Sequence, residues 1–114
     1  MLNQMVEHSG AQLDLTYGAL AHPVRRQLLE LLKPATARVT ELASEFDISL
    51  AATSKHIQVL ESAGLITRQI SGRDHVLAAR PQSLTVAREW IDRYRSYWEQ
   101  RLDALDAQLR RAHR

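Results

Sequence analysis

The hydrophobic pattern of this chain changes period at Gly64, and no other feature of the sequence limits the fold as strongly. Across residues 50–63 the apolar side chains recur at helical spacing and stop at a glycine, a common helix terminator. Residues 65–70 alternate instead, as in a strand, and residues 75–79 return as a second strand. Because Ser-Gly-Arg-Asp at residues 71–74 lies between them, we predict a β-hairpin with a four-residue loop and a glycine at its tip.

The segment before this hairpin predicts a helix-turn-helix. Residues 39–46 are amphipathic, and Thr36 or Thr40 can act as the N-cap of a helix there. Ser49 can cap the next helix, over residues 50–63, because a serine oxygen accepts a hydrogen bond from an unpaired first-turn N–H. Two short helices joined by a tight turn and followed at once by a hairpin form a winged helix.

Prolines delimit the other predicted helices. Pro23 lies in the first turn of one helix, which Pro34 ends, and residues 13–20 predict a short helix before it. After Pro81 the apolar residues from 84 to 112 follow a heptad-like seam, typical of a long helix that packs against a second copy. The fold class is therefore mainly α with a small β-hairpin. We expect one domain over residues 1–114, with a winged-helix core at 11–80 and a terminal dimerisation helix at 82–112.

The charge of the chain is placed where a winged helix would meet nucleic acid. The formal net charge is only +2, but residues 49–80 hold four cations against two acids. In the helix from residue 50, Ile57 is expected to face the core, leaving hydroxyls, one ammonium and one carboxamide toward solvent; these groups suit a polyanion. We therefore expect double-stranded DNA as a partner. The candidate DNA-binding residues are Ser49, Thr53, Ser54, Lys55, His56, Gln58, Arg68 and Arg73.

His56 has two open interpretations: it donates to a phosphate, or it supports the helix from a half-buried position. The aromatic residues between 90 and 98 also have two. They form the core of a homodimer interface, or they line a pocket with the helix at 13–20 that holds a small apolar effector. The residues predicted at the dimer interface are Leu13, Tyr17, Leu84, Trp90, Ile91, Tyr94, Trp98, Leu102 and Leu105.

Several runs of the sequence together resemble the ArsR family of bacterial transcriptional regulators. They are Tyr-Gly-Ala-Leu-Ala-His-Pro-Val-Arg-Arg from residue 17, Glu-Leu-Ala from residue 41, Ser-Lys-His-Ile-Gln-Val-Leu-Glu-Ser-Ala-Gly-Leu-Ile from residue 54, and Gly-Arg from residue 72. The similarity covers residues 13–80, and residues 90–105 are similar to a branch of the family without recognisable metal ligands. The resemblance implies a homodimeric winged helix that represses its operator and releases it when an effector binds.

The same resemblance places Ser54, Lys55 and His56 on the recognition helix and Arg73 on the wing. The chain departs from the family pattern at Leu50 and Ala51, where many members have polar residues. This departure implies base recognition by fewer side chains. It also favours, mildly, an alternative function as a winged-helix protein-interaction module without specific DNA binding.

Several other classes of function are excluded or unsupported by the sequence. The chain has no cysteine, so a disulfide framework or a thiolate metal site cannot form. The terminal helix has one histidine, and its acids pair with arginines one turn away, so we expect no metal and no cofactor. No nucleophile–base pair or phosphate-binding glycine loop indicates an enzyme. Without a transmembrane run or a signal-peptide pattern, we expect a cytoplasmic protein that does not enter the membrane.

Overall fold

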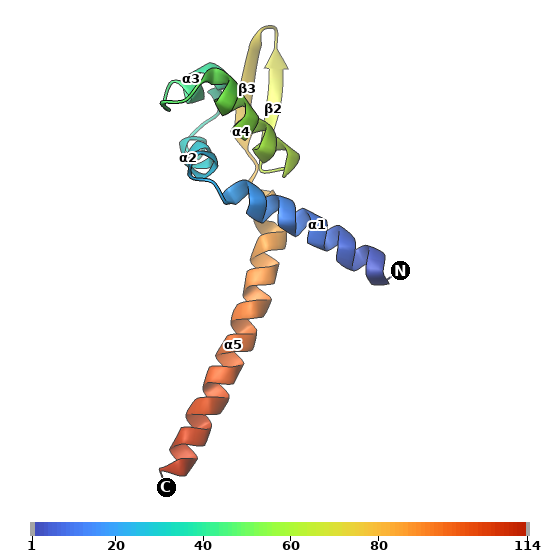
Figure 1. Cartoon of the computed structure of the whole chain (residues 1–114), viewed down its shortest axis with the longest axis vertical. Coiled ribbons are helices and arrows are strands. Elements are labelled where there is room, and N and C mark those ends of the chain that lie inside the picture. The colour runs from blue at the N-terminus through green and yellow to red at the C-terminus, as the bar shows by residue number, and fades with distance from the viewer. Residues whose placement is uncertain (1, 114) are drawn as a thin grey trace.

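The computed structural model of the chain has the expected order of elements, with a long helix leaving a small winged domain (Figure 1). It describes the backbone of residues 2–113 and the side chains of residues 10–113. The elements are α1 (Leu2–Leu20), α2 (Pro23–Leu31), β1 (Ala37–Arg38), α3 (Val39–Ala43), α4 (Leu50–Ser62), β2 (Ile66–Ser71), β3 (Asp74–Ala79), the 3-10 helix η1 (Pro81–Leu84) and α5 (Thr85–Ala112). The predicted fold class, mainly α with a hairpin and a long C-terminal helix, is confirmed.

The core lies where α2, α4 and the hairpin meet. Leu28 of α2, Ile57 and Leu60 of α4, and Leu77 of β3 are each 0% exposed. Burying a side chain of this size contributes about 1.5–3 kcal/mol, so turning α4 about its axis would be costly. The rotation of α4 is therefore set by its apolar face.

Both ends of α4 are closed by local hydrogen bonds. At the start, the Ser49 hydroxyl oxygen accepts from the N–H of Ala52 at 3.0 Å, which confirms the predicted cap. At the end, Gly64 adopts φ +74°, and the N–H of Leu65 donates to the carbonyl of Leu60 at 3.0 Å. This is a Schellman motif, and Gly64 allows it because only glycine adopts this backbone conformation without strain.

The wing is a three-stranded antiparallel sheet in the order β1-β3-β2. Ser71 pairs with Asp74, so the predicted four-residue loop is wrong and the turn has two central residues. Gly72 takes the first of them with φ +62°, the position that requires glycine in a type II′ turn. The strand β1 was not predicted, because its two residues show no hydrophobic period; it pairs Ala37 with Leu77.

The boundaries or caps of three helices differ from the predictions. The first helix extends over Leu2–Leu20 rather than 13–20. The Thr36 and Thr40 caps are wrong, since α3 begins after Arg38 without a side-chain cap. The long helix begins at Thr85, after a turn of 3-10 helix. None of the helices in the described residues combines the length and apolar character needed to cross a membrane.

Within the described residues, α5 packs on the rest of the chain near its start. The Tyr17 hydroxyl of α1 donates to the carbonyl of Ala87 at 3.3 Å, and the Tyr17 ring meets the Trp90 ring edge-on at 6.3 Å. Beyond this contact α5 extends away from the domain (Figure 1), and the molecule reaches 72 Å along its longest axis. Most of α5 is therefore exposed to solvent.

The Schellman motif leads to a prediction for Gly64→Ala. We expect a loss of about 1–2 kcal/mol in the free energy of unfolding, because alanine is strained at positive φ. The added Cβ would also lie 3.3 Å from the Ser83 hydroxyl. Gly18→Ala is the matched control: Gly18 is helical with open space around its Cβ position, so this substitution should stabilise slightly. Urea unfolding at one protein concentration measures both, and a Gly64→Ala variant as stable as wild type would contradict the prediction.

Candidate nucleic-acid interface

The face of α4 opposite the core forms the candidate DNA-reading surface. Lys55 and Gln58 are exposed there, and Ser54 is half-buried. The prediction that Thr53 faces solvent is wrong, because Thr53 is 0% exposed and its hydroxyl donates to the carbonyl of Ser49 at 3.0 Å. Satisfying the hydroxyl within the helix removes the penalty of burying it. Thr53 is therefore a core residue that cannot reach a base.

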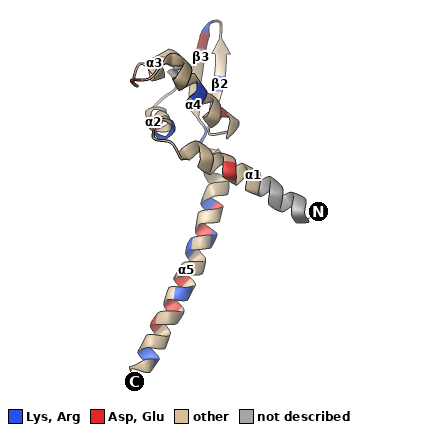
Figure 2. Cartoon of the chain, viewed as in Figure 1, with Lys and Arg blue, Asp and Glu red and all other residues tan. Residues whose placement is uncertain are grey.

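A hollow lies between the first turn of α4, the start of α3 and the hairpin. It brings the predicted residues Ser54, Arg68 and Arg73 together, although Arg73 is 19 positions beyond Ser54 in the chain. Positive charge is visible on α4 and close to the hairpin tip (Figure 2). The residues that line the hollow are Arg38, Val39, Thr40, Leu50, Ser54, Arg68, Arg73, Asp74 and His75.

The cations of this surface are not equivalent. Arg68 is half-buried and forms a bidentate ion pair with Glu61, with Nη2–Oε1 at 2.6 Å and Nε–Oε2 at 3.2 Å. Its Nη1 also lies 2.9 Å from Nδ1 of His75. Arg68 thus attaches the hairpin to the end of α4. Lys55 and Arg73 are exposed and form no ion pair within the described residues, which leaves their charges available to a partner.

His56 contacts the corner between α1 and α2. Its Nδ1 lies 3.1 Å from Nη1 of Arg25, and its ring centroid is 4.3 Å from that of His22. Because a guanidinium only donates, Nδ1 of His56 accepts this hydrogen bond and the imidazole is neutral. Burial, followed by the neighbouring His22 and Arg25, lowers the pKa of His56 below 6.5. This geometry favours the supporting role over direct contact with phosphate.

Two arginines that the sequence interpretation missed position this corner. Arg25 Nε donates to the carbonyl of Ala19, and Arg26 Nη1 donates to the carbonyl of Leu20, both at 2.7 Å. They close the C-terminal end of α1, whose last carbonyls have no helical partner. A signal was present: two cations in the first turn of α2 oppose the dipole of that helix, so another negative partner is expected.

The other missed residue is Gln12 of α1. Its Nε2 donates to the carbonyl of Ala63 at 3.2 Å and so binds the end of α4. A glutamine on a helix surface has no pattern that could have revealed this contact. Together with Arg25 and His56, Gln12 ties the recognition-helix candidate to α1 and α2.

The predicted dimer residues divide into two groups. Leu13 and Tyr17 of α1 are half-buried in the described structure, whereas Leu84 of η1 and those on α5 are exposed. The rings of Trp90 and Tyr94 stack at 5.2 Å, and Trp98 meets Tyr94 edge-on at 6.1 Å. We call this group, with Tyr17, the aromatic ladder. The apolar seam continues toward the end of α5 through Leu102, Leu105 and Leu109, each more than half exposed.

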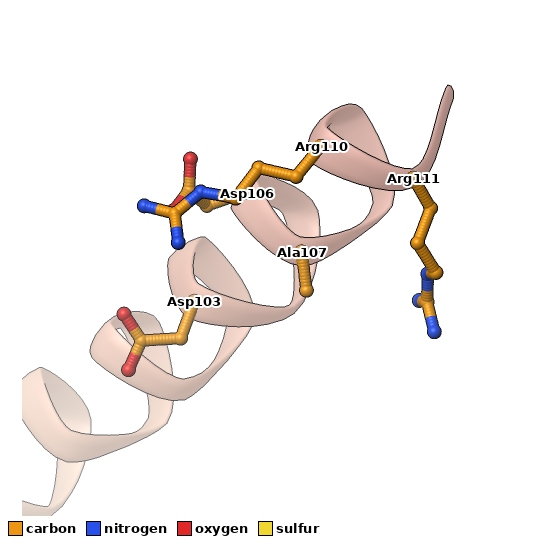
Figure 3. A pocket seen from close by; sticks show the side chains of 5 residues that line it. All are labelled: Asp103, Asp106, Ala107, Arg110 and Arg111. Carbon is orange, nitrogen blue, oxygen red and sulfur yellow. The ribbon is translucent and has the colours of Figure 1, made fainter. Parts of the chain in front are cut away.

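A further hollow at the end of α5 does not have the features of a ligand-binding site (Figure 3). A single helix provides all its lining residues, and Arg110 forms an ion pair with Asp106 at 2.9 Å. The Arg111 side chain extends away from this pair (Figure 3). Across the described residues, no three histidines or carboxylates gather closely enough to bind a metal ion.

Comparison with known proteins decides the family. A helix-turn-helix domain model matches residues 20–69. The chain is 33% identical over 81 residues to the HTH-type transcriptional regulator Rv2034 of Mycobacterium tuberculosis, covering 71% of this chain and 76% of Rv2034. A crystallised ArsR family transcriptional regulator matches with a TM-score of 0.76 and 36% identity, over 79% of this chain and 93% of that one. The chain belongs to the ArsR family.

Two further relatives agree with this assignment. An ArsR-like transcriptional regulator from Rhodococcus sp. RHA1 matches with a TM-score of 0.74 and 26% identity, over 86% of this chain and 92% of that one. The transcriptional repressor SdpR of Bacillus subtilis is 32% identical over 61 residues, which are 54% of this chain and 68% of SdpR. This ArsR protein is therefore a transcriptional regulator with a winged helix-turn-helix.

The environment of His56 predicts a pH dependence of stability. The unfolded chain takes up a proton at His56 near pH 6.5, while the folded chain resists it, so stability is lost as the pH falls below 6.5. His56→Gln keeps an acceptor for Arg25 without the titration and should lose less stability between about pH 7.5 and about pH 5. Urea unfolding at both pH values measures this.

The control for this experiment is His113→Gln, which removes an exposed histidine at the end of α5. It should keep the wild-type pH dependence. An equal loss of stability in wild type and His56→Gln would show that His56 does not resist protonation in the fold.

Proposed function

We propose that this ArsR protein is a repressor that binds a palindromic operator as a homodimer. SdpR, which is similar to this chain over 54% of the chain's length, is a transcriptional repressor. The observation that carries the proposal is the exposed apolar seam on α5, which extends from the aromatic ladder to Leu109. Contiguous apolar surface of this extent marks an interaction site.

The seam fits a second copy of the same helix. Trp90 is 41% exposed, Trp98 46% and Leu105 51%, yet all lie on the apolar face of one 28-residue helix. A helix this long gains its stability in water mainly by packing an apolar face. Spacing of three and four residues along the seam suits packing between two helices. A two-fold pair would bury the same patch on both copies.

A dimer of this kind would place two α4 helices in successive major grooves, about one helical turn apart. We propose that Lys55 and the wing residue Arg73 contact phosphates, with Ser49 at the first turn of α4 beside them. Ser54 and Gln58 then face base edges, where glutamine can pair with adenine. Two-fold symmetry of the protein predicts a palindromic operator.

An apolar effector at the aromatic ladder stays a prediction. The ladder follows one face of α5, with rings half-exposed in a row, and such a ridge favours a partner helix over an enclosed pocket. Release by an effector would require that the effector bind the DNA-free dimer more tightly than the DNA-bound one.

Leu105→Glu tests the dimer. A carboxylate in the centre of the seam would be buried without a partner, so we expect a monomer at micromolar concentration by sedimentation equilibrium. Ala107→Glu adds the same charge on the opposite side of α5 and should remain dimeric. We expect the monomeric variant to bind a palindromic duplex, selected from a random library, at least tenfold more weakly than wild type, because it loses the second half-site.

Two results would contradict the proposal. A wild-type chain that sediments as a monomer would exclude the α5 dimer. A random-library selection that enriches no sequence would exclude the operator and favour the protein-interaction module instead.

A further inference from the structure

We propose that Leu50 recognises thymine, by packing its side chain against the 5-methyl group in the major groove. The inference rests on the DNA-binding role proposed for α4 and adds to it one specified base.

The position of Leu50 is the first observation. It is the first residue of α4, directly after the Ser49 cap, and it is 53% exposed. It lines the hollow between α4 and the wing, together with Ser54 and Arg73. An aliphatic side chain thus shares the hollow with three arginines and Asp74, on the surface that would approach a polyanion.

The register of α4 is the second observation. Leu50, Ser54 and Gln58 are each four residues apart and therefore share one stripe of the helix. In helix-turn-helix proteins the N-terminal residues of the recognition helix contact the base edges. Leu50 is consequently placed at the end of the stripe that enters the groove.

The chemistry of the major groove identifies the base. A leucine side chain has no hydrogen-bond donor or acceptor, so it gains nothing from the polar groups of guanine, cytosine or adenine. The one apolar group at the major-groove edges of the four bases is the 5-methyl of thymine. Contact with this methyl removes apolar surface of both partners from water.

Val59 provides a matched comparison on the same helix. It is 39% exposed, and it lines a groove between α4 and α1, which Lys55 and Gln58 also line but Leu50 does not. Exposure alone therefore does not place an aliphatic residue of α4 in the hollow between α4 and the wing. Val59→Ala removes apolar surface from α4 without changing the residue that would contact thymine.

The experiment replaces thymines one at a time with deoxyuridine, which lacks the 5-methyl group. The duplex is an enriched site from a random-library selection with the wild-type protein, and affinity is measured by competition fluorescence anisotropy. We expect each half-site to contain one thymine at which this single replacement matters. Replacing it should weaken binding by the wild-type protein about three- to fivefold, which is the effect of one methyl group.

Leu50→Ala should bind the thymine and deoxyuridine duplexes equally at that position, whereas Val59→Ala should keep the wild-type ratio. Because Leu50 is exposed, we expect the Leu50→Ala chain to fold, and circular dichroism checks this. The wild-type comparison needs no variant, so it tests the inference even if Leu50→Ala is unstable.

The outcomes separate this inference from the proposed function. If a sequence is enriched but no thymine shows the effect, or if Leu50→Ala keeps the thymine preference, the role of Leu50 is refuted and DNA binding stands. If the selection enriches nothing, specific DNA binding fails and the role of Leu50 fails with it.

Discussion

The burial of one face of α4 is the constraint on which the rest of this structure depends. Ile57 and Leu60 have no exposed surface, and each contributes about 1.5–3 kcal/mol by leaving water. Any rotation of the helix would expose both. Packing of the core, and not contact with DNA, therefore turns the surface formed by Leu50, Ser54 and Gln58 outward. The proposed recognition of DNA bases uses this orientation.

Polar contacts hold α4 in place, both at its two ends and where it meets the neighbouring helices. The Ser49 cap and the Gly64 motif close its two ends, while Gln12 and Arg25 connect it to α1 and α2. Several of these bonds involve helix termini, where backbone groups lack helical partners. Satisfying them with side chains of neighbouring helices couples the orientation of α4 to that of α1, against which α5 packs.

Much of this architecture was predictable from the sequence because proline, glycine and serine act locally. Pro23, Ser49 and Gly64 mark helix boundaries through the conformation or cap of a single residue, and the structure has them there. Thr53 was misplaced because residue polarity does not show that a threonine hydroxyl turns back to its own helix. The contacts of Arg25 depend on where α1 ends in space, and β1 on a pairing with β3, so no local pattern contains them.

The central claim is that the surface between α4 and the wing binds DNA phosphates. The most direct test is the salt dependence of affinity for an enriched duplex, compared between wild type and Arg73→Ala. Each phosphate contact contributes about 0.9 to the slope of log affinity against log salt, so losing both copies of Arg73 in a dimer should reduce it by about 1.8. Arg111→Ala removes an equal charge at the end of α5 and should leave the slope unchanged. An Arg73→Ala slope equal to that of wild type would contradict the account.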